Sequence, residues 1–278
     1  MSPGALAGGF GSRLRFGAGA RNGAGMGFTF GPAIAALFMV VFARVGVLMM
    51  LMPALGERFV PARVRLALAV FLTIAMMPIV RPLLPAQALQ GNAVFTTLFL
   101  ELAIGLMIGL CARIVIASLQ TAGNFVSQAL GLGFAETVDP SQGGQAAALG
   151  NLLTMLGVTL LFATDGHHMV IAAIGGSYTA LPPGAAPPTG DAAMLALGTM
   201  GKGFSIAVQI AAPFIVFGVI INLGLGVLSR LMPALQVFFL GMPATIMIGF
   251  IILLAAIGTM MAVFLREVSD FLLPFMAR

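Results

Sequence analysis

Long apolar runs separated by short polar segments fill the sequence from residue 32 onward. An α-helix needs about 20 apolar residues to cross a bilayer, and several runs reach that length. The run at 66–80 is shorter, which is typical of half a hairpin that does not fully cross. The pattern predicts an all-α, polytopic membrane protein built from helical hairpins. The runs cover residues 32–52, 66–80, 93–117, 149–164, 168–181, 204–228 and 235–265.

The third run predicts an unusually long helix. No turn signal stops it before Gly131, so it would contain about 36 residues and measure roughly 54 Å, more than a bilayer is thick. Gln120, Asn124, Ser127 or Gln128, and Gly131 recur every three or four residues, which places a polar stripe on one face. This stripe indicates contact with water or a partner backbone, unless its side chains bond to neighbouring helices within the membrane.

The segment from Gln128 to Pro140 interrupts the apolar pattern with glycines, two acids and a proline. Irregular backbone at membrane depth is tolerated only inside protein or along a water-filled path. The segment therefore indicates a passage through the membrane, or a stopper for one.

Residues 165–168, Asp-Gly-His-His, join two short apolar runs and predict the turn of a helical hairpin. Asp165, His167 and His168 are also the best candidates for metal ligands in the sequence. Adjacent histidines cannot both lie on one helix face, however, and no further ligand stands nearby. We therefore expect a polar hairpin tip and no metal site.

The composition excludes an ordinary soluble domain, because 60% of the residues are hydrophobic, 8% are charged and the mean hydropathy is +1.11. The 13 basic residues outnumber the 8 acidic ones but form no patch with interleaved aromatics, which argues against nucleic-acid binding. Cys111 is the single cysteine, so a disulfide framework is excluded. Residues 1–31 are rich in glycine and predict a flexible extension, and residues 32–278 predict one helical membrane domain.

Patterns that carry catalysis are missing from the sequence, which has no serine nucleophile elbow, no Cys–His arrangement and no phosphate-binding loop. We therefore expect neither an enzyme nor a cofactor. Arg44 and Glu101 lie within or near apolar runs, where an unpaired charge is costly. They form either a structural ion pair or part of a proton or ion relay.

A set of motifs occurs in a specific order and spacing, although each motif is weak alone. The segments are Arg44, Pro53, 57–68, 121–123, 131–140, 165–167, 181–182 and 230–238. Together they resemble the FliR family, flagellar export-gate proteins of bacterial type III secretion, and the resemblance covers about Pro32 to Leu273.

The resemblance implies a channel subunit of the flagellar basal body in the bacterial inner membrane, part of a gate that passes unfolded flagellar proteins. It implies assembly with FliP-like and FliQ-like subunits, beside FlhB-like and FlhA-like components. It also implies a loop at about 130–146 that plugs the closed pore. The plug positions are Leu130, Gly131, Leu132, Gly133, Phe134, Glu136, Asp139 and Pro140.

Two other functions stay open at this point. An injectisome export-gate protein would share the fold and mechanism but serve another system. A secondary transporter would require paired broken helices around a site at the midplane of the membrane.

Overall fold

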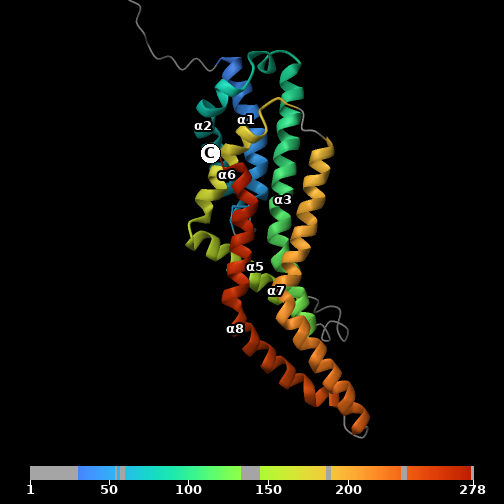
Figure 1. Cartoon of the computed structure of the whole chain (residues 1–278). Coiled ribbons are helices and arrows are strands. Elements are labelled where there is room, and N and C mark those ends of the chain that lie inside the picture. The colour runs from blue at the N-terminus through green and yellow to red at the C-terminus, as the bar shows by residue number, and fades with distance from the viewer. Residues whose placement is uncertain are drawn as a thin grey trace, which may run out of the picture.

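The structure, a computed structural model, describes residues 31–53, 55–56, 60–132, 145–185, 189–232 and 237–276. Within these ranges the chain forms helices and no strand (Figure 1), so the predicted all-α membrane fold is confirmed. The predicted N-terminal extension lies outside them. The elements are α1 (Pro32–Leu51), α2 (Ala62–Val80), η1 (Arg81–Leu83), η2 (Ala86–Leu89), α3 (Ala93–Ala129), α5 (Gln145–Ala163), α6 (Gly166–Ala180), α7 (Thr189–Leu231), α8 (Val237–Leu272) and η4 (Leu273–Phe275).

Helix α3 is the axis of the fold. It has 37 residues and packs against α1, α5 and α7. Helix α2 covers α1, whereas α8 packs against α7 and α5. Helix α3 ends at Ala129, which agrees with the stop expected near Gly131.

Two glycines spaced one turn apart let α1 approach the α3 backbone. A Cβ atom on Gly105 would lie 3.0 Å from the carbonyl oxygen of Arg44, and one on Gly109 would lie 2.8 Å from the Cβ atom of Leu51. Small residues at this spacing allow close helix packing. The Gly105–Gly109 motif therefore sets the distance between the two helices.

Helices α5 and α6 meet at a corner instead of the predicted hairpin. The chain bends by 81° between Ala163 and Gly166, and Asp165 adopts a left-handed conformation with φ of 57°. This backbone conformation turns the chain within the two residues between the helices. Helix α6 packs against η4.

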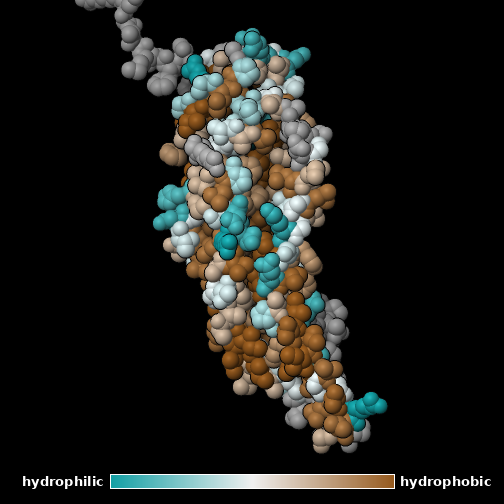
Figure 2. All heavy atoms as spheres, in the orientation of Figure 1, coloured by the Kyte–Doolittle hydropathy of each residue, from teal (hydrophilic) through white to brown (hydrophobic). Residues whose placement is uncertain are grey.

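Helices α7 and α8 are longer than the apolar runs that predict them. Helix α7 has 43 residues and begins at Thr189, well before residue 204, and α8 has 36 residues. Parts of both extend below the other helices as a projecting hairpin (Figure 1). Its surface is strongly apolar (Figure 2) and includes the exposed side chains of Leu223, Leu231, Met247 and Leu254.

Five helices in the described residues are long and apolar enough to cross a membrane, or up to six if the bent pair α5–α6 forms one span. The segment Ala62–Leu83, which contains α2, is one of the five. The expectation that the second run is too short to cross is therefore wrong. The helix continues through Arg63 and Arg65, whose apolar stems extend the usable length while their charged heads reach polar surroundings.

The crossing of α3 and α5 gives a first prediction. A Cβ atom on Gly123 would collide with the backbone of Gly150, so the two helices touch there through their main chains. We expect Gly123→Ala to destabilise the protein by about 1–3 kcal/mol, because overpacking forces the helices apart. Thermal unfolding of the purified protein in detergent measures this loss.

Gly198→Ala is the matched control, since Gly198 lies in α7 and a Cβ atom there would meet no atom within 4 Å. It should leave the unfolding temperature unchanged or raise it, because alanine favours a helix by up to about 1 kcal/mol. Equal stability of the two variants would contradict the close crossing.

Candidate functional site

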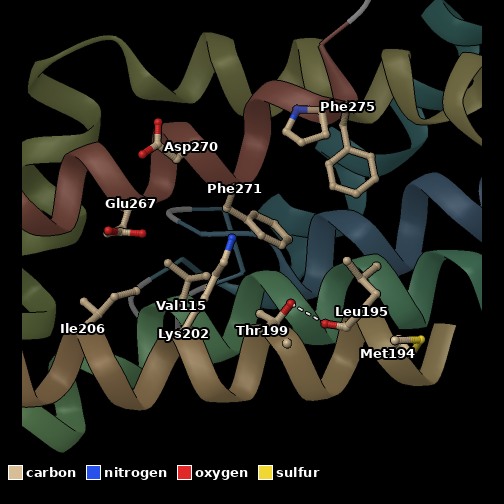
Figure 3. A pocket seen from close by; sticks show the side chains of 12 residues that line it. Val115, Met194, Leu195, Thr199, Lys202, Ile206, Glu267, Asp270, Phe271 and Phe275 are labelled. Carbon is tan, nitrogen blue, oxygen red and sulfur yellow. Dashed lines mark hydrogen bonds between the residues drawn. The ribbon is translucent and has the colours of Figure 1, made fainter. Parts of the chain in front are cut away.

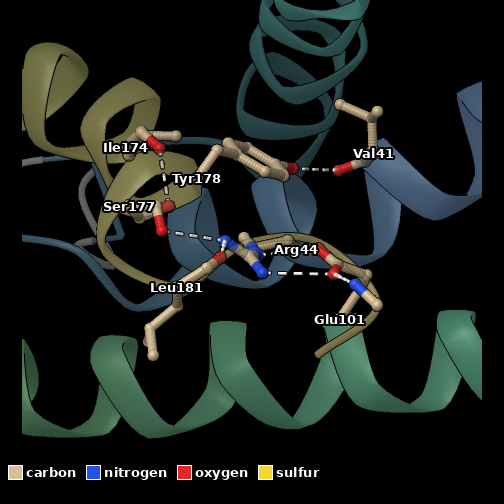
Figure 4. A network of polar contacts seen from close by, with 8 residues as sticks. Val41, Arg44, Glu101, Ile174, Ser177, Tyr178 and Leu181 are labelled. Carbon is tan, nitrogen blue, oxygen red and sulfur yellow. Dashed lines mark hydrogen bonds and ion pairs between the residues drawn. The ribbon is translucent and has the colours of Figure 1, made fainter. Parts of the chain in front are cut away.

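A buried ion pair joins α1 to α3. The side chains of Arg44 and Glu101 are both 0% exposed. The Nε atom of Arg44 lies 2.7 Å from Oε2 of Glu101, and Nη2 donates a hydrogen bond of 3.1 Å to Oε1 (Figure 4). The structure thus brings together the two charges selected from the sequence, in a bidentate arrangement that is the strongest available to this pair.

The same guanidinium also binds the end of α6. Its Nη1 atom donates to the carbonyl oxygens of Ser177, at 3.0 Å, and Leu181, at 2.9 Å. A cation at this position complements the negative end of the helix dipole. The guanidinium carbon also lies 4.3 Å from the ring centroid of Tyr178, whose hydroxyl donates to the carbonyl of Val41 at 3.3 Å.

Glu101 holds the connection that follows α6. The backbone N–H of Gly184 donates to its Oε1 atom at 3.0 Å, and Gly184 has a φ of +79°, which glycine adopts without strain. The pair therefore fixes α1, α3, α6 and this connection at one point. Its donors are directed at fixed carbonyl and carboxylate oxygens, which favours a structural role over a proton relay.

Three of these contacts could not be found from the sequence. Ser177 and Leu181 contribute only backbone carbonyls, and Gly184 contributes only its N–H group. The one residue near the buried pair that stands out in the sequence is Tyr178, because it is the single tyrosine of the chain.

The base of the expected plug loop is a well-formed helix end. Gly131, with a φ of +76°, donates its N–H to the carbonyl of Gln128, and Leu132 donates to that of Ser127, both at 3.0 Å. These two bonds and the left-handed glycine form a Schellman motif, which satisfies the last carbonyls of a helix. They explain why α3 stops here.

Leu130 is fully buried at this end, and its side chain lies directly against Gly249 of α8. Leu132 is half-buried and packs on the core. Leu130 thus anchors the base of the loop in this structure. The remaining plug positions lie outside the described residues, and the role of the set stays a prediction. They are Gly133, Phe134, Glu136, Asp139 and Pro140.

The polar stripe of α3 divides between two environments. Gln120 faces α5, where its Oε1 accepts a hydrogen bond of 3.4 Å from Thr154, and Ser127 is buried. Asn124 and Gln128 are exposed. Contact with the rest of the fold therefore applies to Gln120 and Ser127, whereas an outward-facing position applies to Asn124 and Gln128.

Most exposed side chains of α3 lie on one outer face, because they are three, four or fourteen residues apart, and each spacing is close to a whole number of helical turns. This face is apolar in the first half of the helix and polar near the loop. Its members are Phe95, Phe99, Leu102, Leu106 and Leu110, followed by Asn124 and Gln128.

A cavity of about 260 Å³ between α7 and the end of α8 holds a further group of charges (Figure 3). The ammonium of Lys202 points into it beside Phe271, and Glu267 and Asp270 line its other side. Sequence analysis placed these charges outside the spans, but α7 and α8 continue through them. Charges on membrane helices require water or a partner of opposite sign.

The three groups at the α5–α6 corner do come together. The rings of His167 and His168 lie 4.2 Å apart, and the candidate ligand atoms of Asp165 and both histidines lie within 4.8 Å of one another. The argument that adjacent histidines point apart is therefore wrong here. The corner is the N-terminus of α6, however, whose dipole disfavours a cation. Asp165 and His168 are also largely exposed, with side chains 81% and 72% accessible.

Comparison with known proteins assigns the family. Residues 35–271 match the family described as "Bacterial export proteins, family 1". A flagellar biosynthetic protein FliR of Caulobacter vibrioides is 43% identical over 214 residues, which cover 76% of this chain and 84% of that protein. The FliR of Escherichia coli K12 is 32% identical over 231 residues, or 82% and 86% of the two chains. The chain belongs to the FliR family of bacterial export proteins.

The resemblance identified from sequence motifs is thereby confirmed. This FliR-family chain is a component of the type III export gate and a membrane protein of the flagellar export apparatus. A Yop proteins translocation protein T of Yersinia pestis is also similar, with 29% identity over 145 residues covering 51% of this chain and 56% of that protein. The flagellar relatives match over a larger share of the chain than this one does.

The buried pair gives a second prediction. Glu101→Ala leaves the Arg44 guanidinium buried without a counter-ion, which destabilises proteins by about 3–5 kcal/mol. We expect little of this FliR-family variant in membranes. Arg44→Lys should also fail, because an ammonium cannot make the bidentate contact and both carbonyl bonds. Quantitative blotting of membrane fractions and thermal unfolding measure both effects.

Arg63→Lys is the control, since Arg63 is exposed on α2, and it should accumulate normally. Exchanging the charges at 44 and 101 restores the ion pair but not the bonds to Ser177 and Leu181, so we expect partial recovery. Wild-type stability of Glu101→Ala would contradict the role assigned to the pair.

Proposed function

We propose that this chain forms part of the wall of the flagellar export channel in the bacterial inner membrane. The channel passes unfolded flagellar proteins, and the loop at about 130–146 plugs it when closed. The chain acts with FliP-like and FliQ-like subunits, beside FlhB-like and FlhA-like components, and has no catalytic role. The observation that most strongly supports this proposal is the polar end of the outer face of α3.

Exposed amides within membrane helices need an explanation. Asn124 and Gln128 lie on α3, and Asn151 lies on α5, next to the crossing at Gly123 and Gly150. An amide that lacks a hydrogen-bond partner in hydrocarbon costs several kcal/mol. A water-filled channel, or the polar backbone of a passing polypeptide, supplies those partners.

The position of the loop supports its role as a plug. The loop follows directly after the polar end of α3, and its first residues are fixed by the Schellman motif and by Leu130 against Gly249. Its sequence continues with Gly133 and Phe134. Glycines permit several backbone conformations at low cost, and large apolar side chains can close a narrow pore by excluding water.

The remaining surface supports assembly with other membrane subunits. The projecting α7–α8 hairpin exposes large apolar side chains, and the cavity at Lys202 exposes charges on the same two helices. Asp270 pairs with Arg266 at 3.9 Å, and a helix that passed beside this cavity could add polar partners for Lys202 and Glu267, which lipid cannot. This combination suits a neighbouring gate subunit.

A secondary transporter fits the structure less well. That class uses paired broken helices, whereas the described residues contain one bent pair, α5–α6. The alternative of an injectisome gate is supported by the likeness to the Yersinia protein. It changes the exported proteins but not the mechanism.

A cysteine crosslink tests the channel wall. In a Cys111→Ala background, we expect Asn124→Cys to crosslink to a flagellar export substrate that is stalled in the gate by a folded C-terminal fusion. The physical reason is that the polar end of α3 would line the path of the polypeptide. Immunoblotting for the substrate detects the product.

Leu106→Cys is the matched control, since it lies five turns away on the same outer face of α3. It should give no substrate crosslink. Equal crosslinking at both positions, or no crosslinking at position 124 while the substrate is stalled, would refute the proposal that the polar end of α3 lines the channel.

Shortening the loop tests the plug separately. Deleting residues 135–143 keeps the Schellman motif and the anchor at Leu130, so the gate should still assemble. We expect an at least severalfold rise in ion conductance of membranes that contain the gate, because water can then enter the pore. A variant with the same nine positions replaced by Gly and Ser separates loss of length from loss of sequence. Unchanged conductance in a fully assembled gate would exclude the plug.

A further inference from the structure

Helix α2 is the least covered of the membrane helices. Only 17% of its apolar window is buried within the chain, compared with 56% for α3. Its 19 residues measure about 29 Å, close to the thickness of a bilayer's hydrocarbon core. Exposed large side chains occur along its length, namely Val64, Leu66, Leu68, Phe71, Ile74 and Ile79.

Arginines stand at both ends of this helix. Arg63 lies in its first turn, and Arg81 follows its last residue, Val80. Basic side chains at the ends of a membrane helix reach the lipid headgroups. The exposed apolar surface and the flanking charges together suit a helix that contacts lipid, with Arg81 near the phosphates.

A cavity of about 470 Å³ opens beside Arg81. It lies between the first turns of α1, the end of α2, and the turns η1 and η2. Arg81 and Gln90 are the polar side chains on its wall, and the others are apolar. Those are Ala33, Ile34, Leu37, Met77, Pro78, Leu84 and Leu89.

The guanidinium of Arg81 has no carboxylate partner among the described residues. Among the acids whose side chains the structure describes, Glu101 is buried with Arg44, and Asp165, Glu267 and Asp270 do not line the cavity. An exposed cation without a counter-ion, on the rim of an apolar cavity, is complementary to a ligand with an anionic head and an apolar tail.

We propose that this cavity binds one anionic phospholipid. Its phosphate accepts hydrogen bonds from the Arg81 guanidinium, whose planar fork matches phosphate geometry, and the amide of Gln90 donates a further bond to the headgroup. An acyl chain lies in the groove between Ile34 and Leu37 of α1 and Met77 of α2. The volume lies within the usual range of small-molecule sites. The site does not depend on the channel or the plug.

The test uses the full chain in its gate complex, reconstituted in nanodiscs that contain phosphatidylglycerol and phosphatidylcholine. Native mass spectrometry counts the lipids that stay bound when the complex is released. We expect retained phosphatidylglycerol in the wild type and about tenfold weaker retention in Arg81→Gln, because a charged phosphate contact is lost. Arg81→Lys should recover part of it.

Arg63→Gln is the matched control, since it removes one exposed arginine from the other end of the same helix. It should keep wild-type retention, and equal loss in both variants would reduce the effect to general surface charge and overturn the site. Equal retention of phosphatidylcholine and phosphatidylglycerol by the wild type would overturn it as well. Arg81 is exposed, so Arg81→Gln should unfold at the wild-type temperature.

Two further measurements distinguish binding of a whole lipid from binding of phosphate alone. Ala33→Trp fills the cavity while keeping Arg81, and it should lose phosphatidylglycerol as Arg81→Gln does. Full retention by this variant would contradict binding of the acyl chain. Excess inorganic phosphate should leave the lipid in place, and its displacement would show a simple phosphate site instead.

Discussion

The buried contact between Arg44 and Glu101 fixes how α1, α3 and α6 of this FliR-family chain meet. A buried ion pair adds little net stability, because removing two charges from water offsets their attraction. Its effect here is to specify geometry. Glu101 and Gly105 are one turn apart on α3, and Arg44 contacts both, through its side chain and its backbone respectively. Helix α1 can therefore dock on α3 at one register, because sliding it by one turn would separate the charges and move Arg44 away from the glycine.

The outer face of α3 changes in character along the helix. Its first half presents Phe95 and Phe99, which suit lipid or a partner helix. Its last turns present Asn124 and Gln128, which require polar partners. The change occurs along one face of one helix that is longer than a bilayer is thick. Because α3 is longer than a bilayer is thick, its polar end lies beside the start of the loop.

Sequence patterns predicted features that depend on local chemistry. The length of α3 followed from its apolar pattern, its end from Gly131, and the charged partners from the cost of burying Arg44 and Glu101. Features that depend on tertiary contacts were missed. The hydrogen bonds to the carbonyls of Ser177 and Leu181 use backbone atoms that every residue has, and the 81° corner depends on the left-handed conformation of one residue, Asp165.

The end of α3 limits how a plug could move. Leu130 is held against Gly249, and the N–H groups of Gly131 and Leu132 are bonded to the last turn of the helix. If the loop moves as proposed, α3 need not unfold, because the contacts that fix its end involve residues only up to Leu132. In the proposed plug, Phe134 is the first large apolar side chain after this point. Leu130, which the family resemblance places within the plug, is the buried residue from which the loop leaves α3.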